Sequence, residues 1–145
     1  MFKIKLTVIL FAMILLLTGC AAKDDFANRS AYSYPPVENI SAKTQRTEYD
    51  GNVESINVLL TNNSDKEFQY DLWWQLEKEV DGEWKVIDFI VEEREFDCLI
   101  RSTRSSANIP CDLKGYVKQP LLPGHYRLWV GGEKGRVPAE FTIKE

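Results

Sequence analysis

Histidine and cysteine, which supply most zinc ligands and many catalytic groups, are scarce in this 145-residue sequence. His125 is the only histidine, so a zinc site built on two or three histidines is excluded. A catalytic triad would have to use His125, yet the sequence contains no Gly-x-Ser-x-Gly segment. His125 follows Pro123 and Gly124, a turn in which a solvated imidazole is expected. We therefore expect no catalysis, no bound metal and no cofactor.

One catalytic arrangement is not excluded by composition. The acidic residues Glu92, Glu93, Glu95 and Asp97 are close in sequence, and two carboxylates suffice for a glycosidase. A run of charges of this type is usually a solvated edge, and we expect that here.

Basic residues are also few. Of the 18 Lys and Arg residues, Lys3 and Lys5 lie within the first 19 positions, which hold no acid, and the remaining 16 face 22 acidic residues. From residue 20 onward the net charge is therefore −6. Duplex binding relies on clustered Lys and Arg that neutralise phosphates, so a nucleic-acid partner is not expected.

Long hydrophobic runs are missing as well. The longest, from Leu6 to Leu17, has twelve residues and is shorter than the roughly 20 that a membrane-spanning helix needs. It follows the short basic segment Met1 to Lys5, which is the order found in a signal peptide. Residues 1–19 are therefore predicted to be a secretory signal.

The end of this run, Leu17-Thr18-Gly19-Cys20, resembles the lipobox of bacterial lipoproteins. The resemblance implies that the chain is cut before Cys20 and that the Cys20 thiol receives a diacylglycerol. Two acyl chains hold a protein on a membrane firmly. We expect a lipid-anchored protein on the extracytoplasmic face of the cell membrane. The alternative is an ordinary secretory signal with a chance cysteine.

Residues 20–39 show neither strand nor helix periodicity and include the pair Pro35-Pro36. This composition predicts a flexible tether with an r.m.s. span of roughly 25 Å. The folded domain is then expected over residues 40–145.

Apolar residues alternate downstream of Ile40, and turn signals recur at short intervals, while no segment keeps a helical period over eleven residues. This pattern predicts an all-β sandwich of about seven antiparallel strands. The expected strands span residues 40–46, 53–62, 68–79, 83–91, 113–118, 126–131 and 139–144.

The turn Asp81-Gly82 leaves two hairpin registers open. A two-residue turn pairs residues whose numbers add to 163, and a three-residue turn with a bulge at Gly82 pairs those that add to 162. In both registers Leu72, Trp74 and Leu76 share a face, which we assign to the core. Trp73 then lies on the opposite face, where it either contacts a partner or is covered by neighbouring side-chain stems.

Three segments, Ile56 to Glu67, Leu76 to Trp84 and Leu122 to Leu128, resemble the marks of a bacterial immunoglobulin-like domain of secreted and lipid-anchored proteins. The third also resembles the tyrosine corner of immunoglobulin and fibronectin type III sandwiches, with Tyr126 as its tyrosine. The resemblance implies an immunoglobulin-like or fibronectin-like fold and leaves function open. Residues 91–115 depart from the pattern because they are longer than such domains need.

Two cysteines, Cys98 and Cys111, remain once Cys20 is assigned to the lipid. An even pair outside the cytoplasm favours a disulfide, which would stabilise the fold by roughly 3 kcal/mol. Two unbridged thiols are the alternative.

Arg101 and Arg104 lie between these cysteines, on an otherwise acidic chain. Their guanidinium groups suit a carboxylate or phosphate of an envelope polymer or an acidic protein surface. With Trp73, they are the candidate binding residues. The alternative is an exposed insertion that binds nothing.

Together these features predict a non-enzymatic, membrane-anchored extracytoplasmic lipoprotein whose domain binds an unknown protein or envelope polymer, or serves structurally. The alternative function is inhibition of a secreted or host enzyme such as a protease, an analogy with other immunoglobulin-like folds that carry a protruding loop.

Overall fold

Strands account for all the regular structure of the chain in the computed structural model, which describes residues 26–30, 34–35, 37–91 and 99–145. No helix occurs within these ranges, and accordingly none is long and apolar enough to cross a membrane. The described strands are β1 (Phe26–Ser30), β2 (Ile40–Thr44), β3 (Glu48–Tyr49), β4 (Ser55–Asn62), β5 (Phe68–Tyr70), β6 (Gln75–Val80), β7 (Glu83–Ile87), β8 (Arg101–Thr103), β9 (Ser106–Asp112), β10 (Gly124–Gly132) and β11 (Gly135–Ile143).

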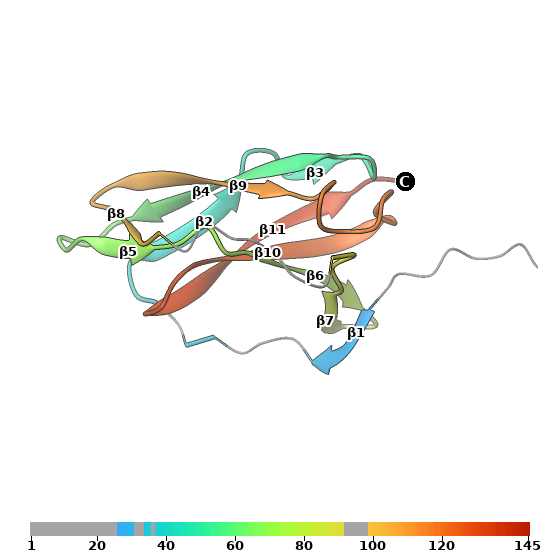
Figure 1. Ribbon diagram of the computed structural model, residues 1–145, viewed down its shortest axis with the longest axis horizontal. Helices are drawn as coiled ribbons and strands as arrows, with labels where there is room; N and C mark the ends of the chain where they lie inside the picture. Colours follow the sequence, from blue (N-terminus) through green and yellow to red (C-terminus); the bar gives the residue numbers. More distant parts are fainter. Residues whose placement is uncertain (1–25, 31–33, 36, 92–98) are drawn as a thin grey trace, which may run out of the picture.

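Two sheets form the main layers of the domain (Figure 1). One has six strands in the order β1-β7-β6-β10-β11-β3, and the other has three in the order β2-β4-β9. The short strands β5 and β8 pair with each other beside these layers. The all-β sandwich predicted from the sequence is confirmed.

The alternating pattern of β4 places one face of this strand in the core. Ile56, Val58 and Leu60 are buried, whereas Asn57 is exposed and Leu59 half-buried between them. The strand is central in its sheet, paired with β2 on one side and β9 on the other. The core between the layers includes Ile56, Val58, Leu60, Trp74, Leu76, Ile109, Leu113, Tyr126, Leu128 and Phe141.

The β6–β7 hairpin has the two-residue turn. Its pairs, among them Glu79 with Trp84, have numbers that add to 163. Asp81 (φ 53°) and Gly82 (φ 80°) both lie in the left-handed region, as a turn of type I′ requires. The register with a bulge at Gly82 is therefore excluded.

The predicted core face of this region is confirmed at two of three positions. Trp74 and Leu76 are buried in the core, and Leu72 is half-buried against it. The ring of Trp74 meets the ring of Phe89 edge to face, with centroids 5.3 Å apart. Trp74 therefore contributes both apolar area and aromatic contacts to the sandwich.

One predicted strand is divided between two sheets in the structure. Residues 68–79 do not form one strand, because the chain leaves β5 and turns at Asp71 before it enters β6 in another sheet. The Asp71 carboxylate accepts a hydrogen bond from the backbone N–H of Trp73 at 2.9 Å, and the Asp71 N–H donates to Gly131. These bonds satisfy the backbone where the chain changes layer.

The predicted strand over residues 113–118 is wrong. The N–H groups of Tyr116 and Val117 both donate to the carbonyl oxygen of Leu113, so the segment is a turn. The strand lies just before it, as β9. Leu113 and Val117 are buried, because the turn packs against the core. The apolar residues that suggested a strand are therefore core residues of a turn.

The predicted tether contains a strand. Residues 26–30 form β1, which pairs antiparallel with β7 at the edge of the six-stranded sheet (Figure 1). An edge strand exposes unpaired backbone groups that another segment can satisfy whatever its side-chain pattern. The missing periodicity of this segment therefore did not reveal the strand.

Candidate functional site

The segment between Cys98 and Cys111 is not a free loop. Arg101 begins β8 and is paired with Tyr70, and residues 106–112 form β9, which pairs with β4 along its length. The signal for β9 was present in the sequence, since Ile109 and Cys111 are buried while Pro110 between them is exposed. The proline and the surrounding serines concealed the alternation.

Arg101 and Arg104 occupy different environments. Arg101 is half-buried on β8, whereas Arg104 is exposed in the two-residue connection between β8 and β9. This connection is held firmly, because the Thr103 hydroxyl accepts from the N–H of Ser105 and donates to the carbonyl oxygen of Ser106. The buried amide of Asn62 also donates to the carbonyl oxygen of Thr103, at 3.0 Å. Of the two arginines, therefore, only Arg104 is an exposed cation, and it lies on a turn that these hydrogen bonds hold in place.

Neither the disulfide nor the lipid attachment is tested, because Cys98 and Cys20 lie outside the described residues. Cys111 is fully buried on β9, and its thiol lies 3.8 Å from the carbonyl oxygen of Ile109. A Cys98–Cys111 bridge would therefore have to enter the core. It stays a prediction.

Trp73 is half-buried and stacked against a charged neighbour. The guanidinium of Arg136 lies 4.3 Å from the centre of its ring. Arg136 is fixed in turn by both carboxylate oxygens of Asp71, at 2.8 and 3.1 Å. The ring of Tyr34 approaches Trp73 edge-on at 6.5 Å. Trp73 thus belongs to a packed cluster with Arg136, Asp71 and Tyr34.

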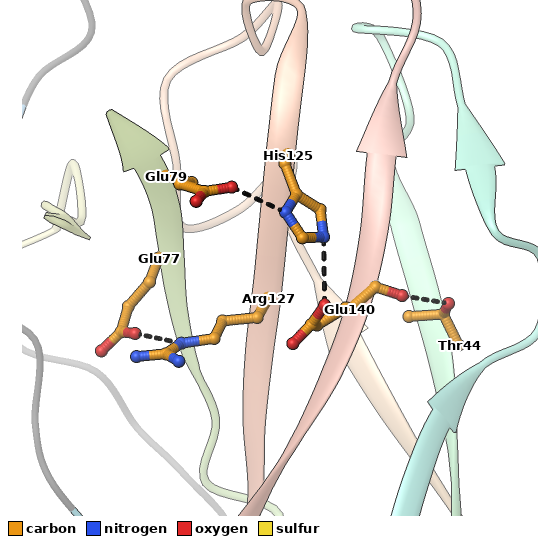
Figure 2. A network of polar contacts seen from close by, with 6 residues as sticks. All are labelled: Thr44, Glu77, Glu79, His125, Arg127 and Glu140. Carbon is orange, nitrogen blue, oxygen red and sulfur yellow. Dashed lines mark hydrogen bonds and ion pairs between the residues drawn. The ribbon is translucent and has the colours of Figure 1, made fainter. Parts of the chain in front are cut away.

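A second cluster lies on the outer face of the six-stranded sheet. Arg127 on β10 lies between the rings of Trp84 and Trp129, at 4.2 and 4.8 Å from their centres. Its Nε donates to the carboxylate of Glu77 at 2.6 Å, as Figure 2 shows. Glu77 has no exposed area, and it also accepts from Trp129 Nε1 and from the amide of Gln75. The buried charge is thereby fully compensated.

His125 lies between two glutamates rather than in open solvent. Its Nδ1 is 3.0 Å from Glu79 on β6, and its Nε2 is 3.1 Å from Glu140 on β11 (Figure 2). Carboxylates only accept hydrogen bonds, so a neutral imidazole donates to one of them and a protonated one to both. The expectation of a solvated imidazole missed these contacts, which link three strands.

These clusters use their charges internally. In the part of the chain that the structure describes, no three His, Cys, Asp or Glu side chains are placed to hold a metal ion. Sequence reasoning missed both clusters, because their members come from strands about 50 or more residues apart, as in the Glu77–Arg127 pair.

The other outer face carries a different kind of surface. An open hollow of about 410 Å³ lies on the three-stranded sheet. Its lining comes from all three strands and the residue after β2, and consists of Lys43, Thr44, Gln45, Asn57, Leu59 and Asn108. We call it the β2–β4–β9 groove.

The bacterial Ig-like domain family model matches residues 36–142 of the chain. The chain belongs to this family. The match runs from just before β2 almost to the end of β11 and includes the tyrosine corner, in which the Tyr126 hydroxyl donates to the carbonyl oxygen of Leu122. The resemblance noted in the sequence is thus confirmed for the Ig-like domain.

No curated protein matches the sequence. Among solved structures, a β-glucosidase from Erythrobacter marinus matches with a TM-score of 0.42 and 12% sequence identity. The match covers 79% of this chain and 16% of the β-glucosidase chain. At that TM-score it carries no argument about the function of the Ig-like domain.

Proposed function

We propose that the chain is a non-enzymatic lipoprotein, held on the extracytoplasmic face of the cell membrane by a lipid on Cys20, whose Ig-like domain is a binding or structural module. The observation that carries the proposal is the order of features along the chain. A lipobox-like segment ends at Cys20, and the first strand of the domain begins at Phe26.

The short separation has a physical consequence. From Cys20 to Phe26 the chain advances six residues, which span at most about 20 Å when fully extended. A lipid on Cys20 would therefore keep the β1 edge of the six-stranded sheet close to the membrane surface. The segment between Cys20 and the first described strand is thus shorter than the tether of residues 20–39 expected from the sequence.

Two observations support a non-enzymatic role. Bacterial Ig-like domains serve generally as binding or structural modules, and this one matches the family over residues 36–142. On the outer face of the six-stranded sheet, the carboxylates of Glu77, Glu79 and Glu140 are each engaged by Arg127 or His125. The acidic run that could have held a catalytic pair, Glu92, Glu93, Glu95 and Asp97, lies outside the described residues.

The alternative role, inhibition of a secreted or host enzyme such as a protease, stays a prediction that depends on a protruding segment between Cys98 and Cys111. Much of that segment forms β8 and β9, so a contact surface there would be presented by strands and not by a free loop.

Metabolic labelling with a fatty acid tests the anchor. Wild type and a Cys98→Ala control should both incorporate the label and sediment with membranes. A Cys20→Ala variant should incorporate none and be released, because it has lost the acylated thiol. Equal labelling of the Cys20→Ala variant would disprove the anchor assignment.

A further inference from the structure

The β2–β4–β9 groove is lined almost entirely by uncharged polar groups. Asn57 and Asn108 supply side-chain amides from β4 and β9, and Gln45 supplies a third just after β2. Lys43 is the only charged residue among the six that line the groove, on a chain in which 28% of residues are charged. Leu59, half-buried, is the single purely apolar side chain.

The strand register brings these groups together. Leu59 is paired with Lys43 on one side and with Asn108 on the other. Asn57 lies two residues before Leu59, on the same face of β4. The backbone N–H of Gln45 donates to the carbonyl oxygen of Asn57 at 3.1 Å, which holds Gln45 beside the sheet. The amides therefore surround an aliphatic centre on a rigid frame.

Four of the five polar side chains that line the groove are available to a ligand, whereas the Thr44 hydroxyl donates to the carbonyl oxygen of Arg46. In the described ranges, no side-chain hydrogen bond or ion pair engages Lys43, Gln45, Asn57 or Asn108. On the opposite outer face, by contrast, Glu77, Arg127 and His125 are held by internal partners. The two faces of the sandwich thus differ in what they offer to solvent.

We propose that the β2–β4–β9 groove binds an uncharged glycan of the N-acetylhexosamine class. Each side-chain amide offers a donor beside an acceptor, which matches both vicinal hydroxyls and the N–H and C=O of an acetamido group. Leu59 would contact the apolar C–H face of a sugar ring. The hollow of about 410 Å³ lies within the usual size of small-ligand sites, about 300–1,000 Å³.

Charge argues for a neutral ligand. Polyanions are recognised by several basic side chains acting together, and the groove has only Lys43 on a domain with an acidic balance. A basic ligand would find no carboxylate among the six lining residues. An uncharged polyhydroxylated chain is the class that the lining fits.

The position of the groove agrees with the proposed lipid anchor. The inference rests on that proposed function, because the anchor would place the domain beside the glycan of the cell envelope. β1 joins the six-stranded sheet, and β2, β4 and β9 form the other sheet (Figure 1). The groove is lined by residues of that second sheet. A membrane close to the β1 edge would leave the β2–β4–β9 face accessible to the envelope glycan.

The test measures binding of chitotetraose, an uncharged oligomer of N-acetylglucosamine, to the full-length chain in detergent micelles by calorimetry. Asn57→Ala combined with Asn108→Ala should weaken binding about tenfold or more, because two hydrogen-bonding amides are removed. The matched control is Asn63→Ala, an exposed asparagine outside the groove whose backbone N–H donates to Asn39.

Equal affinity of wild type and the double variant, or no binding by wild type, would overturn the proposal. Unchanged denaturation midpoints for all variants would show that any loss reflects contact and not unfolding. The outcome is independent of fatty-acid labelling at Cys20, so failure of one proposal does not imply failure of the other.

Discussion

The hydroxyl of Tyr126 donates a hydrogen bond of 2.6 Å to the carbonyl oxygen of Leu122, four residues earlier. The Tyr126 side chain is fully buried, and its ring stacks on Phe141 with centroids 5.6 Å apart. The bond thus joins the loop before β10 to the centre of the core.

Tyr126→Phe should lower the free energy of unfolding by about 1 kcal/mol or more, because it deletes this bond and keeps the ring. Urea denaturation measures the change. Tyr70→Phe is the matched control, since the half-buried Tyr70 makes no side-chain hydrogen bond within the described residues. If both variants unfold at the wild-type midpoint, the tyrosine corner has no stabilising role.

The features that the sequence predicted correctly are local. The tyrosine corner spans five residues, the turn at Asp81-Gly82 spans two, and the alternation of β4 is readable within eight. Each depends on side chains and backbone preferences that act over a short stretch of chain, so no knowledge of distant partners is needed.

The features that it missed depend on distant partners. Trp73 packs on Arg136, which is 63 residues away, and β1 is held by backbone groups of β7. The β2–β4–β9 groove exists only because two registers place Lys43, Leu59 and Asn108 side by side. None of these contacts between distant segments produces a periodic pattern in the sequence around the residues that make it.

The buried pair of Glu77 and Arg127 gives a second prediction. Arg127→Ala should destabilise the domain by about 3–5 kcal/mol, because it leaves the Glu77 carboxylate buried without its counter-ion. Lys144→Ala, which removes an exposed partner of Glu48, should cost less than about 1 kcal/mol. Chemical denaturation of both variants provides the comparison.

A double variant separates the charge effect from loss of packing. Adding Glu77→Gln to Arg127→Ala replaces the buried carboxylate that has lost its counter-ion with a neutral amide, and it should recover part of the lost stability. A double variant no more stable than Arg127→Ala would mean that the stacked guanidinium between Trp84 and Trp129, and not its charge pairing, supports the sheet.

The surface ion pair between Glu83 and Lys85 on β7 predicts that stability depends on pH. The Lys85 ammonium, 2.5 Å from the Glu83 carboxylate, lowers the pKa of Glu83 through its hydrogen bond and its charge. The resulting stabilisation is present above the ordinary carboxyl pKa and is lost as the pH falls through the lowered one. NMR titration of Glu83 should give a midpoint below the ordinary value, and Lys85→Ala should return it there. An unaltered midpoint in Lys85→Ala would contradict the pairing.

Two glycines with positive φ predict different responses to a methyl group. At Gly82 (φ 80°), a Cβ would meet no atom within 4 Å, so Gly82→Ala should cost only the strain of the left-handed backbone, about 1–2 kcal/mol. At Gly131 (φ 143°), a Cβ would lie 2.5 Å from the carbonyl oxygen of Gly135 and 2.9 Å from Cα of Arg136.

Both of these atoms belong to the backbone of β11, so they cannot move aside as a flexible side chain would. Gly131→Ala must therefore disturb the pairing of β10 with β11, and we expect a larger loss of stability than for Gly82→Ala. Urea denaturation of the two variants under identical conditions makes the comparison. If Gly131→Ala unfolds at the same midpoint as Gly82→Ala or later, β10 and β11 do not approach each other this closely at the end of their hairpin.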